Sequence, residues 1–384
     1  LPPSELKVKA DHLRAELAKA GASGVLIVQE GAMRWLTGTR HQISDVAADA
    51  ASPVQALVLS KGSGLDITFL TTRIEMPRVQ DQLGPIYERA EGIKAAYSTD
   101  RPSLPVGVSA PGSPGYADLI GGIVMPLVGG LEGDPYARLS WLIAATTALL
   151  AKSAHEIEPG MNGAQVRARV LANLLEHDIE SNLVLVALAG QEGHLHPLYD
   201  ARYRIERDGW VKLVAGARLA EMIVSATVQV KFGKPPSKEA AEGYRALQEG
   251  TVEYADCYRA GAVEGDIYTE VGRRFADLER AHALPGFAAA AYAHHMGGPT
   301  SPIGNRDYLV EKGGKHVIRA WTQFAINPVE PKANTKVELQ GIVMPQGAPH
   351  VPDLSTFTPP ALLTFREVVS KGGARATVAD ILQR

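Results

Sequence analysis

The sequence has 384 residues, of which 45% are hydrophobic and 21% charged, and this composition predicts a globular protein of about two domains and excludes a small disulfide-stapled one. Its 39 Lys and Arg residues against 42 Asp and Glu residues give a net charge of -3, with both signs interspersed along the chain. We therefore expect a small-molecule substrate and no nucleic acid as partner.

The cysteine content and the apolar runs bear on the compartment. A single cysteine, Cys257, excludes an internal disulfide and a cysteine-based zinc site, which favours a cytoplasmic protein. The segment from Leu1 to Leu13 contains no hydrophobic run of the kind found in signal peptides. No run approaches the ~18 apolar residues of a membrane span, so we expect no membrane partner. Because the sequence does not begin with Met, we expect that it has been trimmed.

Residues 1–133 contain short apolar runs separated by turns, the pattern of an α/β domain. From Ser109 to Pro135 the sequence is rich in glycine and proline, which is typical of a domain junction. We place the boundary near Gly133, so that a second domain covers residues 134–384. In the first domain the expected helices span residues 5–20 and 75–83, and the expected strands span residues 25–28, 56–59, 67–70 and 106–108.

The second domain repeats one turn-to-helix segment. The nine residues Glu-Pro-Gly-Met-Asn-Gly-Ala-Gln-Val around Gly160 match in form the nine residues Arg-Ala-Gly-Ala-Val-Glu-Gly-Asp-Ile around Gly261, and an amphipathic helix follows each. The same offset of 101 residues carries His194 onto His295. We interpret the repeat as two pseudo-symmetric halves that form one site between them.

Several short motifs occur in the order and spacing of one known family. They are Met33–Gly38, His196–Pro197, Asp208–Leu213, His294–Gly297, Phe324–Pro328 and Thr335–Glu338. On these motifs the chain resembles the creatinase, prolidase and aminopeptidase P family along nearly its whole length. The resemblance implies an α/β N-terminal domain of ribonuclease-H-like, creatinase N-terminal type, an α+β pita-bread C-terminal domain, and a homodimer with active sites near the subunit contact.

The resemblance also implies positions for five metal ligands, which hold two divalent ions in the family's peptidases. Val214 and Ser225 stand where the family has two Asp, and Asn327 stands where it has the first of two Glu. Only His294 and Glu338 match the pattern. Valine offers no donor atom, and neutral Ser and Asn bring no charge to balance a dication. We therefore expect no metal and no other cofactor.

Histidines are the expected proton carriers, because creatinase, within the same family, works without metal through a His that acts as acid and base. His196 aligns with that residue, and an ordinary pKa of about 6.5 lets it take and give a proton near neutral pH. The alternative is that His196 caps a loop. For a second catalytic histidine the alignment favours His294 and the internal repeat favours His295. Adjacent extended residues point in opposite directions, so one of the two is expected to be structural.

Glu338 is expected to accept a hydrogen bond from the substrate or to act as a second proton carrier. The alternative is a strand carboxylate paired with a neighbour such as Lys336. Ser225 and Asn327 are expected to turn the family's metal cradle into a neutral polar pocket that binds substrate.

Three further residues are candidates for substrate binding. Arg202 and Arg306 lie close in sequence to the proposed site loops, where a guanidinium could clamp a substrate carboxylate. Trp35 could line the pocket from the first domain. The alternatives are exposed surface arginines and a packed tryptophan.

Three functions follow as hypotheses. The favoured one is a metal-independent enzyme that cleaves a C–N bond of a small polar metabolite by histidine acid/base chemistry, with lyase, isomerase or biosynthetic tailoring chemistry as variants. The second is a catalytically inactive peptidase homologue that binds a peptide or protein partner. The third is an Xaa-Pro aminopeptidase-like metallopeptidase, against which the missing ligands argue. Convergence of the named histidines and Glu338 on a closed cavity would favour an enzyme, and an open groove would favour a binder.

Overall fold

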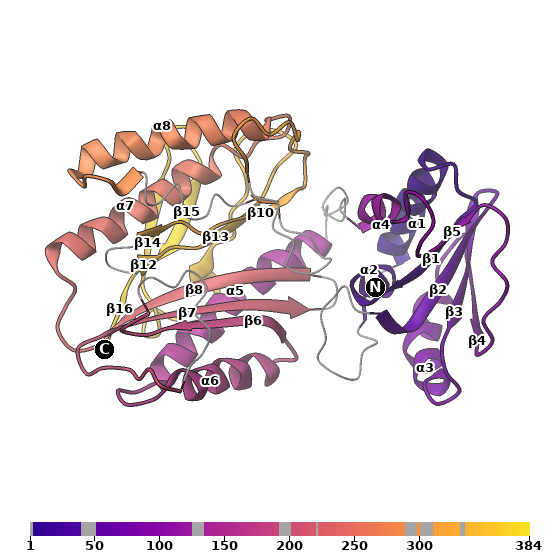
Figure 1. The fold of residues 1–384 in the computed structure, drawn as a ribbon, viewed down its shortest axis with the longest axis horizontal. Helices are drawn as coiled ribbons and strands as arrows, with labels where there is room; N and C mark the ends of the chain where they lie inside the picture. The colour runs from indigo at the N-terminus through magenta and orange to yellow at the C-terminus, as the bar shows by residue number, and fades with distance from the viewer. Residues whose placement is uncertain are drawn as a thin grey trace. The chain divides into compact units, whose positions relative to one another are not determined.

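The computed structural model describes residues 3–39, 51–124, 134–191, 201–219, 222–288, 298–299, 310–330 and 335–384. The chain divides into two compact units (Figure 1). The first comprises Leu1–Gly130 with the short segments Ala220–Met222 and Ser301–Arg306, and the second comprises the remainder. The predicted boundary at Gly133 lies outside the described residues and stays a prediction. Within the described ranges, no helix is both long and apolar enough to cross a membrane.

The first unit is built on a five-stranded mixed sheet of order β4-β3-β2-β1-β5. Neighbours among β1, β2 and β3 run antiparallel, whereas β4 is parallel to β3 and β5 is parallel to β1. In β3 the alternate residues Leu65, Ile67 and Phe69 are buried, because successive side chains of a strand point to opposite faces. The strands are β1 (Gly24–Gln29), β2 (Ala51–Lys61), β3 (Gly64–Leu70), β4 (Ile93–Ser98) and β5 (Val108–Ser109), and the helices are α1 (Pro3–Lys19), α2 (Glu30–Thr37), α3 (Met76–Tyr87) and α4 (Tyr116–Val124).

The last strand of this unit is shorter than the sequence predicts. Val106 was expected to begin a strand, but its side chain is fully exposed and β5 begins only at Val108. The Val108 N–H donates to the Pro105 carbonyl at 3.2 Å, so the residues between them form a turn. Gly107 takes a positive φ of 84° in that turn, a conformation that glycine adopts without strain.

The second unit has two sheets with pairs of helices on their outer sides (Figure 1). Helices α5 and α6 pack against the sheet of order β16-β8-β7-β6, and α7 packs against the sheet of order β13-β10-β9. The helices are α5 (Asp134–Glu156), α6 (Gly163–Leu175), α7 (Lys238–Ala255) and α8 (Glu264–His282). The strands are β6 (Glu180–Ala187), β7 (Trp210–Leu219), β8 (Met222–Lys231), β9 (Gly298–Pro299), β10 (Gln323–Ile326), β13 (Leu339–Ile342) and β16 (Leu382–Gln383).

Two small hairpins complete this unit. One pairs β11 (Val329–Glu330) with β12 (Thr335–Lys336), and the other pairs β14 (Phe365–Val369) with β15 (Arg375–Ala379). A short 3-10 helix, Leu354–Thr356, precedes the second hairpin. The β14–β15 hairpin also packs against α7, and after it the chain ends with β16 paired in parallel to β8.

The two repeated segments of the sequence form the same local structure. The Gly160 N–H donates to the Ile205 carbonyl at 2.8 Å, and the Gly261 N–H donates to the Ile318 carbonyl at 2.8 Å. Both glycines have a positive φ, of 94° and 88°, which favours glycine at these turns. In each case a helix begins three residues later, α6 at Gly163 and α8 at Glu264.

Candidate functional site

Five of the nine predicted site residues lie among the described residues: Glu338, Ser225, Asn327, Arg202 and Trp35. His196, His294, His295 and Arg306 fall outside them, so the roles predicted for these four stay predictions.

Strand alternation gathers polar side chains between the two sheets of the second unit. Phe324, Ile326 and Leu339 belong to the hydrophobic core shared with α7 and α8. Their sequence neighbours Gln323, Asn327, Glu338 and Gln340 therefore point the other way, and Glu338 and Gln340 contact Ser225 of β8. We call the resulting set of buried or half-buried side chains the polar layer; its members are Lys212 of β7, Ser225, Thr227 and Gln229 of β8, Gln323 and Asn327 at the two ends of β10, and Lys336, Glu338 and Gln340 of the β12–β13 segment.

Glu338 lies at the centre of the contacts in this layer. Its side chain is only 1% exposed. The Ser225 hydroxyl donates to Oε1, and the Thr227 hydroxyl donates to Oε2 at 2.6 Å. The Lys336 ammonium lies 3.8 Å from Oε2. Both carboxylate oxygens are thus hydrogen-bonded by the protein, and the charge has a nearby counter-charge, as the paired-carboxylate alternative expects.

A chain of amides fixes the Ser225 hydroxyl. Gln340 Nε2 donates to Ser225 Oγ at 2.7 Å and to the Ser225 carbonyl at 2.9 Å. Gln323 Nε2 in turn donates to Gln340 Oε1 at 3.0 Å and to the Ile223 carbonyl at 3.0 Å. Because Ser225 accepts from Gln340, its own proton is directed to Glu338.

Asn327 lies beside Glu338 and keeps one acceptor atom open. Ile326 pairs with Leu339 in the antiparallel register of β10 and β13, which places the next residues, Asn327 and Glu338, next to each other. The Asn327 Oδ1 atom is buried and has no hydrogen-bond partner in the described part of the chain. A buried acceptor without a donor is costly, so this oxygen is a suitable contact for a substrate N–H or O–H.

Lys212 is a member of the layer that the sequence analysis missed. It lies on β7, two residues before Val214, and is 4% exposed. Burial, with further repulsion by Lys336, lowers its pKa from 10.5 to about 7. The sequence does indicate that Lys212 is unusual, because it lies between Val211 and Leu213 in an otherwise hydrophobic strand. A lysine in such a strand is expected to be buried among polar side chains.

Thr227 and Gln340 were also missed, although their pattern is visible in the sequence. Thr227 follows Ser225 at a spacing of two residues, and Gln340 follows Glu338 at the same spacing. Polar residues at every second position of a strand share one face. Two such faces can meet only when their sheets pack together, and the sequence does not give that packing.

The described residues do not fit a dinuclear metal centre. Val214 has no donor atom, and the Ser225 hydroxyl is engaged by Glu338 and Gln340. Glu338 is the one carboxylate among the described ligand positions, and two hydroxyls and an ammonium already face it. Two dications need several carboxylates to balance their charge. In the described ranges no cluster of three or more His, Cys, Asp or Glu could hold a metal ion, and His294 is outside them.

The remaining two predicted residues lie elsewhere. Arg202 is exposed, and its guanidinium carbon lies 5.8 Å from the centre of the Tyr203 ring. Trp35 is buried in the hydrophobic core of the first unit, where its carbonyl accepts from Lys9 Nζ at 2.6 Å. The packing alternative accounts for the described contacts of Trp35, and the substrate-binding role of both residues stays a prediction.

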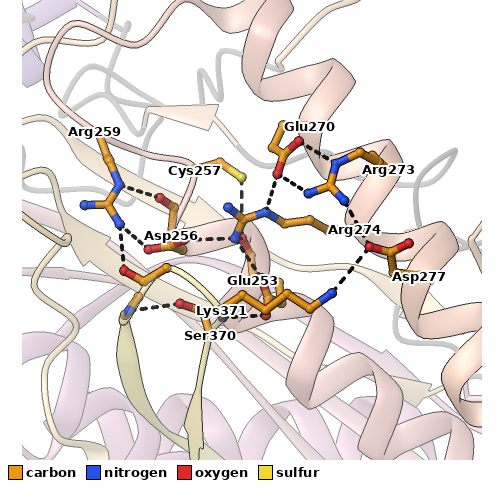
Figure 2. Close-up of polar contacts among 12 residues, drawn as sticks. Glu253, Asp256, Cys257, Arg259, Glu270, Arg273, Arg274, Asp277, Ser370 and Lys371 are labelled. Carbon is orange, nitrogen blue, oxygen red and sulfur yellow. Dashed lines mark hydrogen bonds and ion pairs between the residues drawn. The ribbon is translucent and has the colours of Figure 1, made fainter.

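A second polar network joins α7, α8 and the turn of the β14–β15 hairpin (Figure 2). Arg274 contacts Glu253 at 2.6 Å, Asp256 at 2.9 Å and Glu270 at 2.9 Å. The single cysteine, Cys257, lies beside it. Burial raises the pKa of the Cys257 thiol to about 12, and the nearby guanidinium of Arg274 offsets this only in part. The thiol therefore stays protonated near neutral pH and is unsuited to nucleophilic catalysis.

Comparisons with known proteins agree with this fold. Residues 142–347 match the sequence profile of the metallopeptidase family M24. Among solved structures, dipeptidase PepE from Mycobacterium ulcerans is 17% identical, with a TM-score of 0.65 over 91% of this chain and 96% of that one. An Xaa-Pro dipeptidase from Bacillus anthracis is 14% identical, with a TM-score of 0.67 over 91% of this chain and 98% of that one.

A third structure, the prolidase from Pyrococcus horikoshii, is 15% identical, with a TM-score of 0.61 over 89% of this chain and 97% of that one. A search of curated protein sequences gives no match. The structural matches extend over both units. They confirm the predicted fold, an α/β N-terminal domain followed by an α+β pita-bread domain.

Proposed function

Because the chain belongs to metallopeptidase family M24, we propose that it is an enzyme of this family's fold that works without a metal ion and hydrolyses a C–N bond of a small polar metabolite. The observation that carries the proposal is the set of contacts at Glu338, whose oxygens are bonded by two hydroxyls and faced by the Lys336 ammonium. A carboxylate neutralised in this way is a poor ligand for a dication. We further propose a homodimer in the cytoplasm with no resident cofactor.

Hydrolysis of a C–N bond requires two proton transfers. Water must lose a proton as it attacks the carbon, and the leaving nitrogen must gain one. In this proposal His196 takes the first proton and delivers the second, as a general base and then a general acid. Asn327 Oδ1 accepts a hydrogen bond from a substrate N–H. Glu338 orients the Ser225 and Thr227 hydroxyls and so shapes the polar wall against which the substrate lies.

The solved structures support a second candidate, a peptidase. The proteins that they describe are named as a dipeptidase, an Xaa-Pro dipeptidase and a prolidase. On this alternative the chain would cleave Xaa-Pro dipeptides with bound metal. The residues at positions 214, 225 and 327 argue against it, because none of the three is a carboxylate.

Elemental analysis separates the two candidates. The protein is purified without chelator and analysed again after incubation with manganese, cobalt, zinc or iron. We expect sub-stoichiometric metal throughout. A Val214→Asp, Ser225→Asp, Asn327→Glu triple variant, which restores the family's three carboxylates, is the positive control and should take up metal. One or more tightly held ions per wild-type chain would overturn the proposal in favour of the peptidase.

A screen of amide, amidino and amino-acid compounds, with Xaa-Pro dipeptides in parallel, then seeks the substrate. Replacing His196 by Ala should lower turnover by about 10²–10⁴-fold, the usual contribution of a general acid/base. His177→Ala is the matched control, because His177 is exposed at the end of α6 and its ring contacts only a helix carbonyl among its described hydrogen bonds. Equal turnover of the two variants would contradict the role of His196.

A further inference from the structure

A cavity of about 540 Å³ lies in the second unit, and none of its described lining residues belongs to the polar layer. Its volume is within the range of small-molecule sites. Helix α7, strand β14 and the residues that follow β15 form its walls. The lining residues that can contact a polar ligand are Tyr244, Arg245, Gln248, Arg366 and Asp380, and Ile381 adds an apolar side chain.

Two carboxylates hold the arginines of this cavity in place. Glu242 Oε2 accepts from Arg245 Nη1 at 2.7 Å, and Glu249 Oε1 accepts from Arg366 Nη2 at 3.2 Å. The second oxygen of each carboxylate bonds a different ring nitrogen of His282, at 2.7 and 2.8 Å. The imidazole therefore links the two ion pairs, and both guanidiniums are pre-organised for a ligand.

Both guanidiniums also keep donors for a ligand. A guanidinium has five N–H groups, and among the described hydrogen bonds Arg245 and Arg366 each use a single nitrogen. Their side chains are 51% and 39% exposed, so a ligand in the cavity can reach them. The planar fork of donors matches a carboxylate, which can accept two parallel hydrogen bonds. The two arginines therefore favour an anionic group on the ligand.

Asp380 gives the cavity a charge of the opposite sign. Its Oδ1 atom accepts from Gln248 Nε2 at 3.1 Å, and the same amide donates to the Ala379 carbonyl at 2.9 Å. Although two arginines line the same cavity, the contacts of the Asp380 carboxylate among the described residues include no ion pair. A carboxylate accepts hydrogen bonds from an ammonium, so Asp380 favours a cationic group on the ligand.

We propose that this cavity is a binding site for an α-amino acid with an apolar side chain. Arg245 and Arg366 bind its carboxylate, and Asp380 binds its ammonium. The apolar side chain of the ligand lies against Tyr244 and Ile381. The inference goes beyond the proposed function and does not depend on it, because none of these residues belongs to the polar layer.

Three compounds of similar shape test the recognition of each charged group. L-leucine carries both groups, 4-methylpentanoate lacks the amino group, and 3-methylbutylamine lacks the carboxylate. Isothermal titration calorimetry on the wild-type protein at about pH 7 measures each affinity. We expect leucine to bind and each analogue to bind about 10–100-fold more weakly, the usual loss for a hydrogen bond to a charged group. Absence of leucine binding, or an equal affinity for either analogue, would overturn the proposal.

A variant of Arg366 tests whether leucine binds in this cavity. Arg366→Gln should weaken leucine binding by about 10–100-fold, and the partly exposed position should tolerate the change. Arg375→Gln is the matched control. Arg375 lies on the same hairpin, is 71% exposed and contacts Glu367 at 3.2 Å, and neither residue lines the cavity. Circular dichroism checks that both variants fold. Equal affinities of the two folded variants for leucine would overturn the proposal.

A variant of Asp380 tests recognition of the ammonium separately. Asp380→Asn should weaken the binding of leucine but not that of 4-methylpentanoate, which has no ammonium to lose. An equal loss for both ligands would contradict the role of Asp380. The result is separable from the fate of the proposed function. A protein with tightly bound metal that still binds leucine in this cavity would overturn the proposed function and support the inference.

Discussion

Arg274 should contribute far more to stability than its sequence neighbour Arg273, although both lie on α8 and bind Glu270. The Arg274 side chain also contacts Glu253 and Asp256 (Figure 2). It is 14% exposed, whereas the Arg273 side chain is 58% exposed. Removing the Arg274 guanidinium leaves the buried Asp256 and Glu253 carboxylates without this counter-charge, which costs about 3–5 kcal/mol. An exposed ion pair such as that of Arg273 contributes little to stability.

Urea unfolding followed by circular dichroism measures the two losses. Arg274→Met and Arg273→Met are a matched pair, since both remove a charge from the same helix and keep an unbranched side chain. Hydrogen exchange adds a local measurement, because the Lys371 N–H donates to Glu253 Oε1 at 2.8 Å and so reports on the hairpin turn that the network holds. This amide should exchange faster in Arg274→Met alone. Equal free energies of unfolding for the two variants would refute the argument from burial.

Two further perturbations test neighbouring parts of the same unit. His282 bonds Glu242 at 2.7 Å and Glu249 at 2.8 Å, and although burial disfavours its charged form, the two carboxylates outweigh this and raise its pKa. Because the folded pKa exceeds the unfolded one, this stabilisation is complete below about pH 6.5 and is lost as pH rises through the folded pKa. The free energy of unfolding in urea should therefore decline over this pH range in the wild type and not in His282→Gln. An unchanged pH profile in the variant would contradict this role of His282. A methyl group at Gly372 would overlap the Asp256 carboxylate, so Gly372→Ala should destabilise the protein by about 1–3 kcal/mol, and the loss should shrink in an Asp256→Ala background. A loss of the same size in that background would show that the overlap is not its cause.

The features that the sequence predicts well are local ones. The turns at Gly160 and Gly261 depend on a positive φ and on the helix that follows, and both are encoded within nine residues. The segment at Val106 shows the opposite case. Its apolar residues favour a strand, but Pro105 and Gly107 beside it close a turn that leaves Val106 in solvent. Short apolar runs predict burial only when turn residues do not interrupt them.

The polar layer depends on contacts between distant strands. The family resemblance predicts that Ser225 and Glu338 lie close together, but it does not predict their further partners, Gln340 for Ser225 and Thr227 for Glu338. These partners follow from the alternation of β8 and β13 and from the packing of one sheet on the other. Another member of the polar layer, Lys212, lies on a third strand, β7. A single sequence contains each polar face separately, and only the packed structure shows that the faces meet.

The charges of the polar layer explain why neutral residues stand at three positions of the family's metal site. A buried carboxylate needs hydrogen bonds and a counter-charge. Glu338 obtains the first from two hydroxyls and the second from Lys336. An additional Asp at position 214 or 225 would need a further cation, which in a dinuclear centre the metal ions supply. Val214 and Ser225 therefore belong with Lys336 as parts of one arrangement, in which a protein ammonium balances the one carboxylate among the described ligand positions.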